Sequence, residues 1–217
     1  MAEPGRRAFV VGHPIAHSRS PKIHGYWLRQ HGIDGSYVAR DVAPGDFSGF
    51  FTTFPGDDYA GGNVTIPHKE AAFALAARCD ETAAAIGAVN TLWLEHGRIV
   101  GGNSDVFGFL ANLDEWAPGW DKARVAVVVG AGSASRGIVY GLQRRGIRDI
   151  RVANRTPDRA RELAGHFGSG VSAHGTDVLR ELCADAGLLV NTTPLGMHGE
   201  PELPADPAWL PDDAVVH

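Results

Sequence analysis

An unbroken apolar run from Val125 to Val129 places the strongest limit on how this chain can fold. Runs of this valine-rich kind form central strands of parallel sheets, which are buried on both faces. The run leads directly into Gly130-Ala131-Gly132, and a helical pattern follows through Arg145. Because parallel strands are joined by crossovers that usually contain helices, this pattern predicts βαβ units with right-handed connections. The predicted fold class is therefore α/β.

The rest of the chain continues the alternation of strand and helix. We expect strands at 8–11, 37–41, 62–65, 149–153 and 188–191, and helices at 20–31, 46–54, 67–77, 80–86, 105–113 and 157–167. Ser20 is the expected N-cap of the first helix, and Pro67 is the expected first residue of the third. Residues 90–95 and 98–101 flank a turn at His96-Gly97 and predict a hairpin.

Composition limits the kinds of partner. The 217-residue chain has a formal net charge of -5 and no block of like charge, so it lacks the basic footprint of a nucleic-acid binder, and a small-molecule ligand is expected. Its apolar runs are shorter than the roughly 20 residues that span a bilayer, so no membrane partner is expected. The only two cysteines, Cys79 and Cys183, lie far apart, which favours a reducing, cytoplasmic location.

The turn at Gly130 has the layout of a Rossmann-like dinucleotide site. A strand, a tight glycine turn and a helix N-terminus bind a pyrophosphate through free backbone N–H groups, although such turns also occur without a ligand. The next strand ends at Asn154-Arg155-Thr156, where an acidic residue would favour NAD. Arg155, with Arg159 four residues later, suits the 2′-phosphate of NADP, unless both arginines are only solvated surface charges.

Polar residues of the first half form a second candidate site. Ser18 and Ser20 precede a helix and could bind a carboxylate near its positive end, although Ser20 could act only as a cap. Lys69 follows an extended Asn/Thr segment and is either a proton donor and acceptor or an ordinary surface residue. Asp105 is the carboxylate best suited to orient Lys69, or else a helix cap. No metal set is expected from the N-terminal histidines.

Seven segments, in this order, resemble the shikimate dehydrogenase family: GHPIAHSRSPKIH, NVTIPHK, GAVNT, GGNSD, VVVGAGSASRG, NRTPDR and NTTPLGM. The resemblance covers most of the chain. It implies an NADP-dependent oxidoreductase that reversibly reduces 3-dehydroshikimate to shikimate in aromatic amino acid and chorismate biosynthesis. It also implies two α/β lobes, a substrate-binding and catalytic domain at 1–104 and a Rossmann-like NADP-binding domain at 105–217, in a monomer or homodimer.

The resemblance also implies roles for individual residues. Lys69 and Asp105 would be the catalytic pair, with Lys69 as proton acceptor and donor and no metal required. The substrate would be bound by Ser18, Ser20, Asn63, Thr65, Lys69, Asn90 and Asp105. The cofactor would be bound by Glu81, Gly130, Ala131, Gly132, Ser133, Ala134, Asn154, Arg155, Thr156, Arg159, Thr193 and Met197.

The chain departs from the family pattern in small replacements and at its end. Ser104 and Thr192 stand where similar sequences usually carry Thr and Ala, Ser133 replaces a common glycine, and Ser135 stands in place of the third glycine of the nucleotide motif. Family members continue for roughly another fifth of their length beyond residue 217. If the chain is complete, we expect an incomplete sheet and poor turnover. The alternatives are an NAD-using quinate/shikimate dehydrogenase and a non-catalytic NADP-binding fragment.

Overall fold

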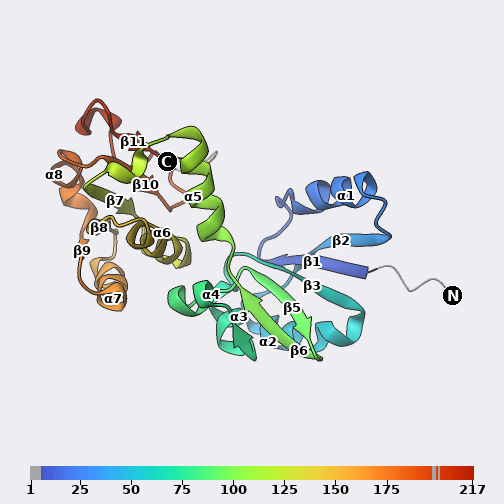
Figure 1. Cartoon of the computed structure of the whole chain (residues 1–217). Helices are drawn as coiled ribbons and strands as arrows, with labels where there is room; N and C mark the ends of the chain where they lie inside the picture. The colour runs from blue at the N-terminus through green and yellow to red at the C-terminus, as the bar shows by residue number, and fades with distance from the viewer. Residues whose placement is uncertain (1–5, 197–198, 200) are drawn as a thin grey trace. The chain divides into compact units, whose positions relative to one another are not determined.

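The computed structural model describes residues 6–196, 199 and 201–217. The chain divides into two compact units, Met1–Ser104 and Asp105–His217, whose elements are labelled in Figure 1. Each unit is a sheet with helices packed on it, so the predicted α/β class is confirmed. Within the described part of the chain, no helix is long and apolar enough to cross a membrane.

The first unit contains a six-stranded mixed sheet. Its spatial order is β2 (Gly35–Asp41), β1 (Arg6–Gly12), β3 (Tyr59–Val64), β5 (Thr91–Glu95), β6 (Arg98–Gly102) and β4 (Arg78–Cys79). β1 pairs in parallel with β2 and β3, and β4 pairs in parallel with β6. β5 is antiparallel to both of its neighbours, and β5 with β6 forms the predicted hairpin.

Helices cover both faces of this sheet. They are α1 (Ser20–Gln30), α2 (Phe47–Thr53), α3 (Lys69–Leu75) and α4 (Glu81–Ile86). Figure 1 shows α1 on one face and α2 with α3 on the other. Phe9 of β1 is fully buried in the α2 face, where its ring meets Phe54 and Tyr59 edge-on with centroids 5.1 and 5.2 Å apart. Aromatic pairs in this arrangement add to the hydrophobic stabilisation of the core.

Two predictions about helix starts in this unit are wrong: the N-cap of α1 and the first residue of α3. α1 begins at Ser20 as predicted, but its N-cap is Arg19, which makes no side-chain capping bond, and not Ser20. α3 begins at Lys69 and not at Pro67, because residues 65–68 form a turn in which the His68 N–H donates to the Thr65 carbonyl over 2.9 Å. Lys69 therefore lies in the first turn of a helix that follows a tight turn.

The second unit contains a five-stranded, fully parallel sheet. Its order is β11 (Val215–Val216), β10 (Leu188–Asn191), β7 (Val125–Val129), β8 (Asp149–Ala153) and β9 (Val171–His174). In chain order this is 5-4-1-2-3, which matches five strands of the Rossmann arrangement 3-2-1-4-5-6 read in reverse. The helices are α5 (Asp105–Trp116), α6 (Ser133–Arg144), α7 (Pro157–Phe167) and α8 (Leu179–Cys183).

The apolar β7 run is explained by the two cores that it separates. Ala126 and Val128 point into a core with residues of α5, α6 and α7. Val125, Val127 and Val129 point into the core on the opposite face, which contains residues of α8. A strand covered on both faces has no polar side, as the sequence predicts. Short 3-10 segments complete the fold at Pro44–Asp46, Phe54–Asp57, Trp120–Lys122, Thr176–Val178 and Pro207–Trp209.

His68 is a buried polar residue that fixes the start of α3. It is 2% exposed, and its ring stacks on Phe47 at 4.4 Å. Its Nε2 lies 2.8 Å from the Val42 carbonyl oxygen, which only accepts, so Nε2 carries the proton. Burial lowers the pKa of His68, the Val42 carbonyl opposes that shift, and His13 adds to it. The neutral ring is thus the form that the fold stabilises.

We expect His68→Gln to make the unfolding free energy less dependent on pH. Because the folded pKa of His68 lies below its unfolded value of about 6.5, the unfolded chain binds the proton first as the pH falls. The stability that neutral His68 contributes is therefore lost below about pH 6.5. Glutamine keeps an N–H donor for Val42 but does not titrate, so the stability difference between wild type and variant should shrink toward acid.

Urea unfolding at a series of pH values measures this difference. The matched control is His31→Gln, because His31 is exposed after the end of α1. A wild-type to His68→Gln difference that stays constant between about pH 7.5 and about pH 5.5 would contradict the assignment.

Candidate active site

Most predicted substrate residues of the first unit lie at one edge of its sheet. β1, β2 and β3 end side by side at this edge, as the pairings Gly12 with Asp41 and Val11 with Val64 show. The start of β5 and the end of β6 meet them there, through the pairing of Thr91 with Gly102. At this edge, the strand ends together with the adjoining loops and helix starts contain Ser18, Ser20, Asn63, Thr65, Lys69, Glu81 and Asn90.

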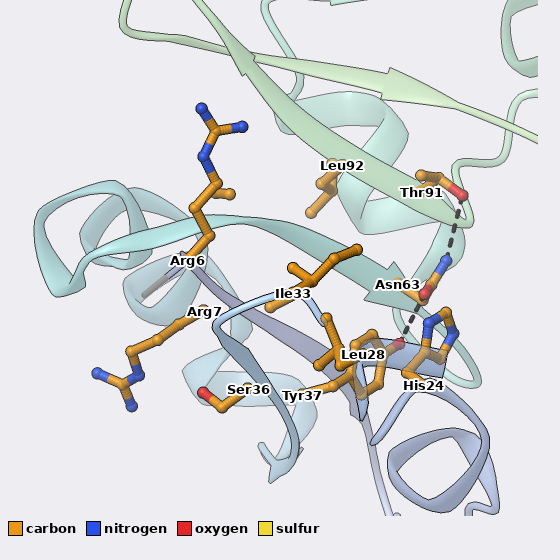
Figure 2. Close-up of a pocket in the computed structure, with 13 residues that line it drawn as sticks. Arg6, Arg7, His24, Leu28, Ile33, Ser36, Tyr37, Asn63, Thr91 and Leu92 are labelled. Atoms are coloured by element: carbon orange, nitrogen blue, oxygen red, sulfur yellow. Dashed lines mark hydrogen bonds between the residues drawn. The ribbon is translucent and has the colours of Figure 1, made fainter. Parts of the chain in front are cut away.

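Asn63 is held by hydrogen bonds on both ends of its side-chain amide. The Tyr37 hydroxyl donates to Oδ1 over 2.6 Å, and Nδ2 donates to the Asn90 carbonyl and to Thr91 Oγ1, each at 3.3 Å. Figure 2 shows the Tyr37 and Thr91 bonds at the Asn63 end of a cavity of about 280 Å³ between α1 and the sheet. His24 stacks on Tyr37 at 4.0 Å. The orientation of Asn63 is therefore fixed, and one Oδ1 lone pair remains for a ligand.

Tyr37 is a contributor that the sequence did not single out. It lies in the middle of β2, and burial raises the pKa of its hydroxyl well above the ordinary value, so it remains a proton donor. An alternating pattern in β2 would have placed Tyr37 on one face of the sheet, but only the pairing of β2, β1 and β3 brings it to Asn63.

Asn90 joins the ends of three strands. It is 7% exposed, its carbonyl accepts from the Val64 N–H at 2.8 Å, and its own N–H donates to the Gly102 carbonyl at 3.0 Å. Its Nδ2 donates to Ser104 Oγ at 3.2 Å, and its Oδ1 accepts from the Ser104 N–H at 3.1 Å. Its side chain therefore fixes the segment after β6.

Asp80 and Asn103 brace the same edge, although neither was among the predicted site residues. Asp80 caps α4 by accepting from the Ala83 N–H at 2.7 Å and also accepts from the Asn103 N–H at 3.2 Å. Asn103 in turn donates to the Ala88 carbonyl at 2.9 Å. A side chain at Gly102 would collide with Asp80, because an added Cβ would lie 2.5 Å from its Oδ2. The glycines of the GGNSD segment are thus required by packing.

Lys69, Ser18 and Ser20 are each half-buried at this edge. Lys69 is the first residue of α3, and its carbonyl accepts from the Val89 N–H at 2.9 Å. Ser18 Oγ accepts weakly from the Ser20 N–H at 3.4 Å, immediately before α1. This arrangement places an ammonium group at the start of α3 and two hydroxyls at or just before the start of α1, and these segments follow the neighbouring strands β3 and β1.

Asp105 and Glu81 are exposed residues at helix starts. Asp105 is the first residue of α5 and belongs to the second unit, so its pairing with Lys69 stays a prediction. Glu81 is the first residue of α4, directly after Asp80. Among the described residues, no cluster of three or more His, Cys, Asp or Glu side chains could hold a metal ion.

The second unit gathers the predicted cofactor residues at the carboxyl edge of its parallel sheet. β7 is followed by Gly130, β8 by Asn154 and β10 by Thr192. β8 lies on one side of β7 and β10 lies on the other, so the strand order reverses at β7. In open parallel sheets, ligands bind at the carboxyl edge where the strand order reverses in this way.

The turn after β7 has the shape that a pyrophosphate requires. Gly130 has φ +111°, and an added Cβ there would lie 2.4 Å from Thr192 Oγ1. Nothing lies within 4 Å of a Cβ added at Gly132, so the backbone is open on its outer side. Ala131, Ser133 and Ala134 complete the turn and begin α6. The 12-residue helix α6 therefore presents its N-terminus to an uncovered surface.

The loops after β8 and β10 hold the remaining cofactor candidates. Asn154 Nδ2 donates to the Thr156 carbonyl at 2.8 Å, which shapes a turn from which Arg155 and Arg159 extend into solvent. Thr193 is held after β10, because its Oγ1 donates to Asn191 Oδ1 at 2.7 Å. Met197 lies outside the described residues.

Comparisons with known proteins agree with the geometry of both units. Residues 10–92 match the model of the shikimate dehydrogenase substrate binding domain, and residues 115–195 match that of shikimate / quinate 5-dehydrogenase. The chain is 62% identical over 216 residues to the shikimate dehydrogenase (NADP(+)) of Mesorhizobium japonicum, covering all of this chain and 77% of that one. It is 58% identical, with the same coverage, to the enzyme of that name from a Chelativorans species.

Solved structures give the same result. A shikimate dehydrogenase from Aquifex aeolicus aligns with a TM-score of 0.89 and 31% identity, over 100% of this chain and 79% of that one. A shikimate 5-dehydrogenase from Thermus thermophilus, in complex with NADP(H) and shikimate, aligns with a TM-score of 0.84 and 36% identity, over 97% and 77%. The chain belongs to the shikimate dehydrogenase family.

Proposed function

We propose that this protein catalyses the NADP-dependent, reversible conversion of shikimate to 3-dehydroshikimate in aromatic amino acid biosynthesis. The observation that carries the proposal is the gathering of Asn63, Thr65, Lys69 and Asn90 at one sheet edge in a chain that is 62% identical to an NADP-dependent shikimate dehydrogenase. Cys79 and Cys183 are free thiols, which supports a reducing, cytoplasmic setting.

The first unit would bind the substrate. Ser18 and Ser20 supply hydroxyl donors for its carboxylate near the positive end of α1, an 11-residue helix. Asn63 is the second-last residue of β3, and Asn90 immediately precedes β5. The fold already orients the side-chain amides of both residues. Fixed donors and acceptors of this kind recognise ring hydroxyls without the cost of ordering them on binding.

Lys69 would move the proton of the reaction. When the C3–H bond breaks, the hydroxyl proton at C3 must leave so that the C=O bond can form. Lys69 accepts that proton in oxidation and returns it in reduction, while Asp105 orients the lysine. When bound, NADP supplies the hydride acceptor.

The second unit would hold the cofactor. The residues fit this group, because the turn from Gly130 to Ala134 is open on its outer side and begins a long helix. Arg155 and Arg159 extend beside it after β8, with Asn154 and Thr156 shaping their turn, and suit a 2′-phosphate. Thr193 lies on the loop proposed to approach the nicotinamide, and Glu81 of the first unit is proposed to touch the cofactor.

The decisive assay follows NADPH absorbance with shikimate and NADP, using protein expressed from its complete reading frame. We expect turnover with this pair and much weaker turnover when NAD or quinate replaces either one. Preference for quinate and NAD would favour the quinate dehydrogenase alternative. Nucleotide binding without turnover of either substrate would favour the non-catalytic alternative.

We expect Lys69→Ala to lower kcat by about 100-fold to 10,000-fold, the usual contribution of a positioned acid/base group. The shikimate KM should change much less, because the lysine acts mainly as charge develops on the oxygen. Steady-state kinetics with Lys122→Ala as the control for loss of an exposed lysine measures this. A Lys69→Ala enzyme with near-normal kcat would remove Lys69 from the mechanism.

We expect Arg155→Asp to reduce the preference for NADP over NAD by at least about tenfold. A hydrogen bond to a charged group contributes about 1.5–3 kcal/mol, and about 1.4 kcal/mol is a factor of ten. The ratio of kcat/KM values for the two cofactors measures the change, and Arg180→Asp, at an exposed position of α8, is the charge control. An unchanged ratio in Arg155→Asp would show that this arginine is only a surface charge.

A further inference from the structure

A chain of hydrogen bonds joins the end of β10 to the turn after β7. The Val129 carbonyl accepts from the Thr192 N–H at 2.9 Å and from Thr192 Oγ1 at 2.7 Å. Thr192 Oγ1 lies 2.7 Å from Ser135 Oγ, and Ser135 Oγ accepts from the Gly132 N–H at 3.1 Å. Residues 57 positions apart in sequence thus share one partly buried contact.

The direction of this chain of bonds is fixed by its two ends. A carbonyl oxygen only accepts, so the Thr192 hydroxyl donates its proton to Val129. Thr192 Oγ1 must then accept from the Ser135 hydroxyl, and Ser135 Oγ accepts from the Gly132 N–H. Every hydroxyl donates once and accepts once, and Ser135 is fully buried. A satisfied buried network of this kind is rigid.

The Thr192 hydroxyl also fills the space beneath the turn. Its Oγ1 is 2.4 Å from where a Cβ on Gly130 would lie, and Ser135 Oγ is 3.4 Å from the same point. The turn therefore rests on the Ser135 hydroxyl from the start of α6 and on the Thr192 hydroxyl and Thr193 methyl group from the loop after β10.

The same network determines which backbone N–H groups of the turn are engaged within the protein. The Gly132 N–H is used by Ser135, so it points inward. Within the described ranges, the N–H groups of Ala131, Ser133 and Ala134 have no backbone acceptor, as expected for the first turn of a helix. These three donors remain for an anion, whereas Gly132 contributes open space.

We infer that Thr192, acting through Ser135, is a positioning residue for the pyrophosphate of the dinucleotide. It sets the turn so that Ala131, Ser133 and Ala134, and not Gly132, present N–H groups to the phosphates. It also links this turn to Thr193, whose hydroxyl is held by Asn191 in the loop after β10. The inference rests on the proposed use of NADP and deepens it, because it assigns separate tasks to residues of the motif.

The test compares a replacement that removes the Thr192 hydroxyl with one that keeps it. Thr192→Val keeps the shape and removes the hydroxyl, so the Ser135 hydroxyl loses its acceptor. Thr192→Ser keeps the hydroxyl. Alanine would leave room for a water that can take over the bonds, so valine is the decisive replacement.

NADPH affinity, measured by the fluorescence of the bound nucleotide, is the first readout and needs no turnover. We expect Thr192→Val to bind NADPH about tenfold more weakly, which corresponds to one lost hydrogen bond, and Thr192→Ser to stay within about twofold of wild type. Ser135→Ala should weaken binding to a similar degree, and the Thr192→Val and Ser135→Ala double variant should be no weaker than either single variant.

Adenosine 2′-monophosphate, measured by calorimetry, separates positioning from general damage. It carries the 2′-phosphate but no pyrophosphate, so its affinity should be the same in wild type and all Thr192 variants. Thr53→Val, which removes a hydroxyl bonded to the Gly49 carbonyl in α2, should leave both affinities unchanged.

Three results would overturn the inference: NADPH affinity unchanged in Thr192→Val, no recovery in Thr192→Ser, or an equal loss for adenosine 2′-monophosphate. A wild-type protein that binds neither nucleotide would instead refute the proposed NADP function on which the inference depends.

Discussion

The hydrogen-bond ladders of the two sheets continue one residue past the strands, and the sites depend on this continuation. In the first unit, the Thr65 N–H donates to the Val11 carbonyl, and the Asn90 N–H donates to the Gly102 carbonyl. In the second, the Gly130 N–H donates to the Ala153 carbonyl, and the Thr192 N–H donates to the Val129 carbonyl. Backbone donors at a buried strand end must be satisfied, so each loop leaves its strand in a fixed direction. The backbone therefore brings the polar side chains that follow the strands to one edge of each sheet. They do not need contacts with one another to gather there.

Buried polar side chains add the second level of order. His68, Asn90 and Ser135 are each less than a tenth exposed, and each bonds to backbone or to another motif. Leaving any of these groups without a partner would cost free energy, so each one specifies a single loop conformation. This gives some motif residues a structural task in addition to any ligand contact. Asn90 fixes the segment after β6, and Ser135 occupies the Gly132 N–H that a simple glycine-motif model would assign to phosphate.

The features that the sequence predicted well are those with a strong local pattern. The valine run of β7, the proline start of α7 and the β5–β6 hairpin all appear within a residue of their predicted limits. β9 and α8 were not anticipated, because Val171–His174 is short and half-buried, and its strand conformation comes from pairing with β8. The start of α3 was misplaced because the turn at 65–68 is closed by a bond that no local preference reveals. Tyr37 was overlooked for a related reason, since its partner Asn63 lies two strands away across the sheet.

Four features can be recognised without the fold: the α/β class, the glycine turn at Gly130, the basic residues after β8 and the family to which the motifs point. Local chemistry is sufficient for these, because apolar period, backbone freedom of glycine and side-chain charge are properties of a short segment. Which hydrogen-bond donors are free and which are already used becomes clear only in the folded chain. The amide of Asn63, the side chain of Asn90 and the N–H of Gly132 are engaged by partners distant in the chain, namely Tyr37, Ser104 and, through Ser135, Thr192. A hydrogen bond has a donor and an acceptor at a defined distance, and folding alone brings such distant groups within that distance.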